Sequence, residues 1–321
     1  MGYLRVAVAG LLAGWMAVSL GSCSDQPLFV RLSPGETGIG FINHNMDTDS
    51  LNILDYLYYY NGAGVCVGDI NNDGLPDIYF AANTGGNKLY LNKGKFRFQD
   101  ITAAAGVGGE GDWTTGVTMA DVNGDGWLDI YVCEVANHVS WDDSTHTWFR
   151  HSRNQLFINN ANPDKDGRVT FTECARQWGL DIRGYCTQAV FFDYDGDGDL
   201  DLFVLQHSAY PTSVFNDTSL RRKYSPVSGG KLFRNDGGHF TDVTRGAGII
   251  SSPMGYGLGV GVADINQDGY EDIYVSNDFY ENDYYYVNQG NGTFKEMNGK
   301  AFGHESRYSM GNDIADLNND G

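Results

Sequence analysis

The chain has 321 residues, of which 19% are charged and 13% are aromatic, with 43 glycines and 7 prolines. This composition favours β-structure over helix bundles or disorder, and the length suits one large domain or two small ones. The formal net charge of −20 argues against an extended basic surface for nucleic acid.

Residues 1–22 are predicted to be a lipoprotein signal peptide. Arg5 precedes an apolar stretch at residues 6–20 that is too short for a comfortable membrane span. The stretch ends in LGSC at residues 20–23, which resembles a bacterial lipobox, so Cys23 is the expected lipidation site. An ordinary secretory signal that happens to precede a cysteine is the alternative. We expect an exported protein that is lipid-anchored to the bacterial cell envelope, at the outer membrane or the cell surface.

The remaining cysteines are Cys66, Cys133, Cys174 and Cys186. Export would permit disulfides, but two of the four lie in apolar, strand-like runs. Small buried thiols are therefore at least as expected, and no Cys/His spacing indicates zinc.

A nine-residue acidic pattern recurs at residues 69–77, 121–129, 193–201 and 264–272, and an incomplete copy begins at Asp316. Each complete copy is followed by an apolar strand-like run, a second run that ends in Asn, a tight turn and a last strand. The last strands open with Phe98, Phe171, Phe240 and Phe294. Four short antiparallel strands per unit of about fifty residues are typical of a propeller blade. The predicted fold class is therefore all-β, a β-propeller, with a β-solenoid or sandwich array as the alternative.

Each complete acidic segment carries Asp or Asn at positions 1, 3 and 5, Gly at position 6 and Asp at position 9. Calcium takes six to eight oxygen ligands, and this spacing offers them from one turn. The expected ligands are Asp69, Asn71, Asp73, Asp77, Asp121, Asn123, Asp125, Asp129, Asp193, Asp195, Asp197, Asp201, Asp264, Asn266, Asp268, Asp272, Asp316, Asn318 and Asp320. About one structural Ca²⁺ per loop is predicted, and plain β-turns are the alternative.

An EF-hand is excluded for these loops because their position 12 is apolar rather than Glu. Residues 162–173 match an EF-hand loop better, but they fall where the repeat places a turn between two strands. An elongated hairpin turn is expected there, and an opportunistic extra Ca²⁺ stays open.

The acidic loops resemble FG-GAP/VCBS repeats, as in integrin α-subunit propellers. The wider pattern, including Asn277-Asp278-Phe279 and residues 309–313, resembles bacterial relatives of cartilage acidic protein, the ASPIC/UnbV group. The resemblance covers roughly residues 60 to 321 and implies a propeller of about seven blades. With four full loops in residues 61–321, an incomplete propeller is expected, in a fragment or a truncated gene product. Residues 23–60 are then a linker, in which residues 29–39 match a fourth blade strand that could close the ring.

Repeats 2 and 3 carry insertions at residues 136–153 and 206–229. Because the chain reverses at each strand, both are expected on the face opposite the calcium loops, the face on which integrin-type propellers bind ligands. The candidate ligand surface comprises Trp141, Trp148, Arg150, His151, Tyr210, Arg221, Arg222 and Tyr224. Four histidines, His207 among them, also lie in these insertions. Loops that only pack on one another are the alternative.

The leading function is a non-enzymatic binding or adhesion scaffold for a glycan or an envelope or extracellular protein. Membrane contact is expected through the lipid anchor only, and no nucleic acid partner is expected. The alternative is a polysaccharide lyase or hydrolase, in which carboxylates such as Asp142 or Asp143 would act, although no catalytic motif is visible. A nonfunctional fragment is the third reading.

Overall fold

The computed structural model describes residues 28–49, 52–54, 56–109, 113–135, 140–142, 147–149, 152–161, 168–208, 210, 217–279 and 281–318. The predicted signal peptide and Cys23 lie outside these residues. The chain divides into two units, residues 1–37 and 38–321. Within the described ranges, no helix combines the length and the hydrophobicity needed to cross a bilayer.

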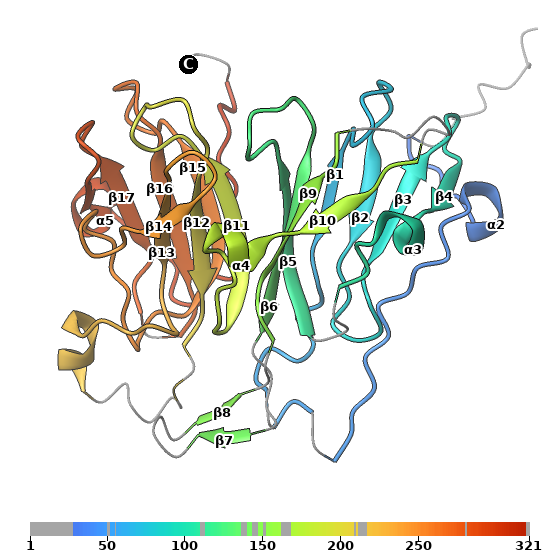
Figure 1. Ribbon diagram of the computed structural model, residues 1–321. Coiled ribbons are helices and arrows are strands. Elements are labelled where there is room, and N and C mark those ends of the chain that lie inside the picture. Colours follow the sequence, from blue (N-terminus) through green and yellow to red (C-terminus); the bar gives the residue numbers. More distant parts are fainter. Residues whose placement is uncertain are drawn as a thin grey trace, which may run out of the picture. The chain divides into compact units, whose positions relative to one another are not determined.

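The second unit contains four antiparallel sheets of four strands each, seen side by side in Figure 1. The first sheet consists of β1 (Val65–Gly68), β2 (Asp77–Phe80), β3 (Lys88–Asn92) and β4 (Phe98–Asp100), and the second consists of β5 (Trp113–Ala120), β6 (Asp129–Val135), β9 (Gln155–Asn159) and β10 (Phe171–Glu173). The third sheet consists of β11 (Cys186–Phe192), β12 (Asp201–Gln206), β13 (Lys231–Asn235) and β14 (Phe240–Asp242). The fourth consists of β15 (Gly257–Ala263), β16 (Asp272–Asn277), β17 (Tyr284–Asn288) and β18 (Phe294–Glu296). The predicted all-β fold of repeated four-stranded blades is confirmed.

Each sheet shares an apolar core with the next one along the chain. Tyr79 of β2 lies in one buried cluster with Ile130 of β6. Leu202 of β12 clusters with Tyr131 of β6, and Tyr286 of β17 clusters with Phe203 of β12. Because the second strand of a blade is buried on both faces, it reads as a continuous apolar run instead of alternating. Stacking of blades therefore buries what one blade alone would expose.

The first strands of the blades surround a common cavity of about 300 Å³. Its lining includes one equivalent residue from each of the five repeats, six positions before the first Asp of the loop. These residues are Ala63, Thr115, Thr187, Leu258 and Met310. Convergence of the same position from successive repeats on one axis is the arrangement of a propeller.

Short helices follow the fourth strands, at α3 (Thr102–Ala105), α4 (Ala175–Trp178) and α5 (Asn298–Ala301). The chain after α4 turns at Gly179 with φ of 79°, and the matching Gly248 has φ of 82°. A Cβ at either glycine would lie 2.7 Å from a carbonyl oxygen of the next blade, Phe240 O or Phe294 O. Glycine is needed at these two positions both for the left-handed backbone and for the close approach of neighbouring blades.

The strand expected within residues 29–39 is not formed. Pro34–Thr37 is instead a short helix, α2, in the first unit. Ser33 accepts a hydrogen bond from the Glu36 backbone N–H, and the Glu36 carboxylate accepts from the Ser33 N–H at 2.8 Å. Ser33, Pro34 and Glu36 thus form a capping box with proline at the first helical position, and this start signal overrides the strand. In the second unit, Gly38 has φ of 82° and approaches the Phe98 carbonyl, as Gly248 approaches Phe294.

The insertions leave their blades at the end away from the acidic loops, as predicted. Ala120 pairs with Asp129 beside the second acidic loop, whereas Trp113 pairs with Val135 at the other end of the same strands. The chain therefore enters the first insertion on the opposite face, where β7 (Ser140–Asp142) and β8 (Thr147–Phe149) form a hairpin. Figure 1 shows this hairpin below the sheets and the acidic loops above them.

A tyrosine-rich segment that was expected to belong to a linker is part of the core. Tyr56, Tyr58 and Tyr59 are buried, and together they contact residues of the second, third and fourth repeats. The ring of Tyr59 lies 4.9 Å from that of Trp113 in β5. The Tyr56 hydroxyl lies 3.1 Å from His207 Nε2. The segment thereby ties several blades together at the end of the cavity remote from the acidic loops.

All four cysteines in the described residues are free thiols, of which Cys133 and Cys186 are buried. Asn154 and Gln206 each donate a hydrogen bond to Cys186 Sγ at 3.2 Å. The expectation of buried thiols holds for these two residues.

Candidate metal centres

The first Asp of each acidic loop closes the loop through backbone hydrogen bonds. In the third loop, Asp193 Oδ1 accepts from Gly196 N at 2.8 Å and Asp197 N at 3.2 Å, and Oδ2 accepts from Gly198 N at 3.0 Å. The same closure joins Asp69 to Asp73 and Gly74, Asp121 to Asp125 and Gly126, and Asp264 to Asp268 and Gly269. The repeated sequence therefore produces the same turn in every complete copy.

The carboxylates at positions 1, 3 and 5 converge in the third loop. One oxygen each of Asp193, Asp195 and Asp197 lies within 4.8 Å of the others. Because Ca²⁺ holds its oxygen ligands at 2.3–2.6 Å, oxygens on opposite sides of one ion are separated by about 5 Å. Asp195 Oδ1 is buried and has no hydrogen-bond partner, so the loop contains an acceptor that a bound cation would satisfy. The donor set and its geometry therefore fit Ca²⁺.

In the first two loops, position 3 is Asn, and its amide lies against the carboxylate at position 5. Asn71 Nδ2 donates to Asp73 Oδ2 at 3.0 Å, and Asn123 makes the same bond to Asp125. The side chains at positions 3 and 5 are thus already in contact, and the Asn side chain also offers a neutral oxygen ligand. These loops carry less charge than the third loop.

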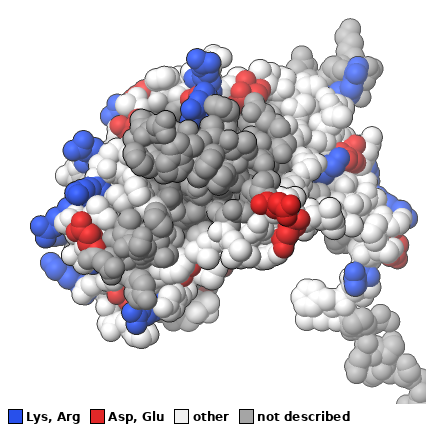
Figure 2. Space-filling model, turned by 90° about the horizontal axis from the view of Figure 1, so that it is seen from below, with Lys and Arg blue, Asp and Glu red and all other residues white. Residues whose placement is uncertain are grey.

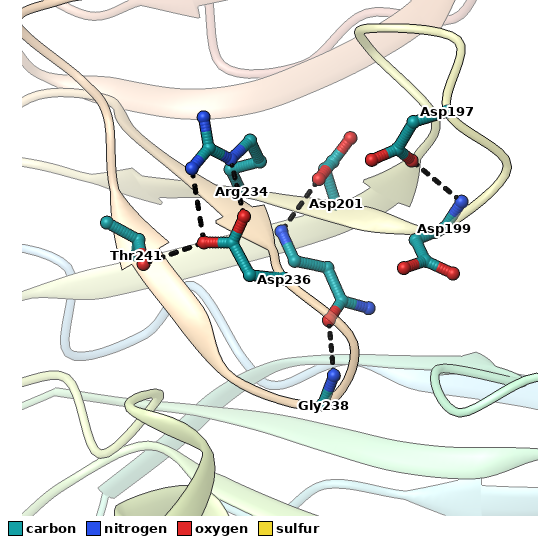
Figure 3. Close-up of polar contacts among 8 residues, drawn as sticks. Asp197, Asp199, Asp201, Arg234, Asp236, Gly238 and Thr241 are labelled. Atoms are coloured by element: carbon teal, nitrogen blue, oxygen red, sulfur yellow. Dashed lines mark hydrogen bonds and ion pairs between the residues drawn. The ribbon is translucent and has the colours of Figure 1, made fainter.

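The Asp at position 9 lies beneath the loop. Asp201 is fully buried. Its Oδ2 accepts from Tyr194 N at 3.1 Å, and its Oδ1 accepts from Asn235 N at 2.8 Å, the second bond being drawn in Figure 3. Asp77, Asp129 and Asp272 are buried in the same way. This Asp therefore fixes the loop to the sheet, and each of its oxygens has a second lone pair for a metal.

Burial raises the pKa of Asp77 to about 6 and the pKa values of Asp129 and Asp201 to about 7. The neighbouring carboxylates of the same loops raise these pKa values further, whereas the backbone N–H donors lower them. Burial also raises the pKa of Asp272. A bound cation would favour the ionised carboxylates and relieve their mutual repulsion.

In the second, third and fourth blades, the Asn that ends the third strand connects successive loops, a relation that the sequence did not predict. Asn159 Nδ2 donates to Ile70 O at 2.9 Å, and Asn235 Nδ2 donates to Val122 O at 3.3 Å. In each pair the acceptor is position 2 of the preceding loop. The Asn that ends each third strand was visible in the sequence, but its partner in the preceding repeat was not.

Two further predicted metal features are only partly within the described residues. In the fifth loop, Asp316 and Asn318 are described and Asp320 is not. The EF-hand-like segment has residues 162–167 outside the described part, and its flanks β9 and β10 pair as an antiparallel hairpin, with Phe171 opposite Asn159. The two strands expected to flank this turn are therefore present and paired.

The structure brings some of the predicted ligand-surface residues together. Arg221 and Arg222 lie in the 3₁₀-helix η2 (Thr218–Arg222), which is capped by Asp217, and Tyr224 follows two residues after the helix ends. All three line one groove. Tyr210 is placed elsewhere: its carbonyl accepts a hydrogen bond from the Tyr256 hydroxyl at 2.8 Å.

The other insertion residues are described in part or not at all. The backbones of Trp141 and Trp148 pair in the β7–β8 hairpin. Arg150, His151 and Asp143 lie outside the described residues. His207, which the sequence placed in the second insertion, is a buried core residue whose Nδ1 lies 2.9 Å from Ser208 O.

The repeated blades and their acidic loops define a class of protein. Residues 69–132, 224–275 and 264–321 match the family described as FG-GAP-like repeat, and the chain belongs to this family.

Among curated proteins, the chain is similar to cartilage acidic protein 1. It is 28% identical to that of Xenopus tropicalis over 221 residues, which are 68% of this chain and 29% of the relative. It is 27% identical to that of Homo sapiens over 218 residues, 68% of this chain and 28% of the relative. The chain thus spans less than a third of the length of these relatives. Among solved structures, a lectin of Agrocybe aegerita, described for its recognition of non-reducing terminal N-acetylglucosamine, aligns with a TM-score of 0.37 and 20% identity, covering 72% of this chain and 50% of that one.

Proposed function

We propose that the chain is a non-enzymatic binding or adhesion scaffold whose blades are stabilised by one Ca²⁺ in each acidic loop. The ligand would be a glycan or an extracellular or envelope protein. The protein would be exported and anchored to the cell envelope through lipid on Cys23.

The observation that carries the calcium proposal is the third acidic loop. Asp193, Asp195 and Asp197 present oxygens within 4.8 Å of one another, and the buried Asp195 Oδ1 has no hydrogen-bond partner. Asp193 accepts hydrogen bonds from three backbone N–H groups of the loop and so helps to hold the loop in this shape. Calcium in this loop would tie β11 to β12, since the loop joins those two strands, and it would play a structural role.

The structural role of the loops leaves the opposite face for ligands. Insertions in two successive blades lie on that face, and surface loops on a rigid scaffold are a common way to build a binding site. In this proposal the carboxylates of the loops coordinate Ca²⁺, so they do not act as a catalytic acid and base.

The test is a binding and turnover experiment on the calcium-loaded chain. The protein is applied to an array of glycans and to a panel of extracellular proteins, and bound saccharides are then analysed for cleavage. The proposal expects a ligand that is retained intact. Cleavage of a bound saccharide would favour the polysaccharide-active enzyme, and the absence of any ligand in both screens would contradict the scaffold.

The anchor is tested separately by metabolic labelling with a fatty-acid analogue. Labelling that disappears in Cys23→Ser supports lipidation at that residue. An unlabelled wild-type protein that is released in soluble form would contradict it and favour an ordinary secretory signal.

A further inference from the structure

A groove of about 480 Å³ lies between η2 and residues 245–251, the segment that leads from the third blade to the fourth. Its lining includes four cationic side chains, Arg221, Arg222, Lys223 and Arg245, together with Tyr224. In Figure 2, Lys and Arg side chains gather at the left edge of the molecule, on the side where the third and fourth sheets lie in Figure 1. This is a local excess of positive charge on a chain whose net charge is −20.

Three of these cations form no close ion pair with a described residue, although Lys223 interacts electrostatically with the nearby Asp217. Among the described residues, no carboxylate lies within ion-pair distance of Arg222, Lys223 or Arg245, and all three side chains are exposed. Arg221 differs, because its Nε lies 2.8 Å from Oε2 of the buried Glu281. That pair fixes one end of η2 to the fourth blade and leaves the other cations available to a ligand.

A buried lysine, Lys231, lies behind the lining of the groove, where it contacts the lining residues Tyr224 and Ser251. Lys231 is 2% exposed. Its Nζ donates hydrogen bonds to neutral oxygens, namely the backbone carbonyls of Ser225 at 2.9 Å and Ser228 at 2.7 Å and the hydroxyl of Ser251. The Lys231 Nζ lies 5.3 Å from the centre of the Tyr224 ring, and the Arg245 guanidinium lies 5.5 Å from it. The Asp242 carboxylate accepts a hydrogen bond from the Tyr224 hydroxyl at 3.3 Å.

The size of the groove favours a small ligand over a folded partner. A cavity of about 480 Å³ falls within the range of about 300–1,000 Å³ that is usual for small-molecule sites. A stable protein interface buries about 800 Å² on each partner instead. Arginine side chains pair with carboxylate and sulfate oxygens in two parallel hydrogen bonds, and a half-exposed tyrosine ring offers an apolar surface beside them.

We propose that this groove binds an anionic saccharide, with the carboxylate or sulfate groups of the sugar held by Arg222, Lys223 and Arg245 and a sugar ring placed against Tyr224. This proposal rests on the proposed scaffold function and specifies its ligand class. It leaves the calcium loops out of ligand binding, since they lie at the other end of the blades.

The experiment measures binding of the calcium-loaded protein to four probes by calorimetry. The probes are a hexamer of galacturonate, sulfated maltohexaose, neutral maltohexaose and inorganic sulfate. Binding is expected for the two anionic saccharides and to weaken as salt is raised, because exposed charges are screened. Each of Arg222→Ala, Lys223→Ala and Arg245→Ala is expected to weaken binding about fivefold, in line with one charge-assisted contact. Arg245→Lys should recover part of the loss, while Arg176→Ala and Lys295→Ala, exposed cations on other parts of the blades, should leave the affinity unchanged.

The outcomes separate the groove from the scaffold. Equal binding of neutral maltohexaose, unchanged affinity in the three groove variants, or binding of inorganic sulfate alone would each overturn the groove proposal. The groove proposal is also overturned if the chain binds none of the four probes but retains a protein or another glycan in the array. In that case the scaffold function stands. The melting temperature of every variant is measured in Ca²⁺, and only variants that melt at the wild-type temperature are used to compare affinities. A loss of affinity in these variants does not come from a loss of folding.

Discussion

The side-chain amide of Asn288 donates a hydrogen bond to the backbone carbonyl of Tyr194 at 2.8 Å. Asn288 ends β17 in the fourth blade, whereas Tyr194 is position 2 of the third acidic loop. The Asn288 backbone N–H meanwhile donates to Asp272 Oδ1 at 2.8 Å, which is position 9 of the fourth loop. One residue therefore joins two successive loops, and the loops of neighbouring blades are mechanically linked.

Replacing Asn288 by Ala removes the bond to Tyr194 O, a second one at 3.2 Å to Glu271 O, and a third in which Asn288 Oδ1 accepts from the Gly290 N–H at 3.0 Å. Leaving a buried carbonyl without a donor costs about 1–3 kcal/mol, so we expect unfolding by urea at a correspondingly lower midpoint. Gln289→Ala, next in sequence and exposed, is the control and should change the midpoint little. Equal midpoints for both variants would show that the link between loops contributes nothing.

The third loop offers a matched pair of substitutions. Asp195→Asn reproduces position 3 of the other loops and should keep the calcium site with lower affinity. Asp193→Asn replaces one of the two oxygens that accept backbone N–H bonds with an amide donor. We therefore expect this loop to lose its ion, and the free energy of unfolding to fall by about 2 kcal/mol. Calorimetric titration with Ca²⁺ should show one site fewer for Asp193→Asn only. If both variants bind as many ions as the wild type, the assignment of this loop is wrong.

Gly248 tests the contact between blades. An alanine there has a left-handed backbone, and its Cβ meets the Phe294 carbonyl at 2.7 Å. Gly292 has φ of 77° and open space around the position of a Cβ, so Gly292→Ala should cost only the backbone strain of about 1 kcal/mol. Gly248→Ala should cost at least about 2 kcal/mol more because two backbones must separate. A thermal denaturation series that ranks the two variants equally would contradict this packing.

His207 gives the stability a dependence on pH. Burial lowers its pKa to about 4 from the ordinary value of 6.5. Because the folded protein keeps the imidazole neutral, its contribution is fully present above pH 6.5 and is lost progressively as the pH falls towards 4, by about 3 kcal/mol in total. The measurement is the free energy of unfolding at pH 7.5 and pH 5. The decrease should be smaller in His207→Phe than in the wild type and unchanged in His239→Gln, an exposed histidine; an equal decrease in all three would contradict the assignment.

Much of the fold could be predicted because each strand carries a local signal. The apolar run after each acidic loop, the Asn that ends β9 or β13 and the Phe that opens β10 or β14 mark the strands one by one. The acidic loops are equally local, since the Asp193 side chain bonds backbone groups only three to five residues ahead.

What the sequence did not predict depends on contacts between distant residues. The partner of Asn288 is 94 residues away, and Tyr58 donates a hydrogen bond to Asp278 across 220 residues. Nothing near Tyr58 in the sequence marks it as core, because the run of tyrosines has no strand or helix periodicity. The short helix at Pro34–Thr37 is different: its capping signal at Ser33 and Glu36 is local and present in the sequence, whereas the similarity to a blade strand predicted a strand there.

Calcium in the acidic loops is tested most directly by thermal melting with and without a chelator. Each ion that binds only the folded state adds about 2.7 kcal/mol at a hundredfold excess over its dissociation constant, so EDTA should lower the melting temperature by more than about 5 °C. Excess Ca²⁺ should restore it. A melting temperature that is the same in EDTA and in excess Ca²⁺ would contradict the account.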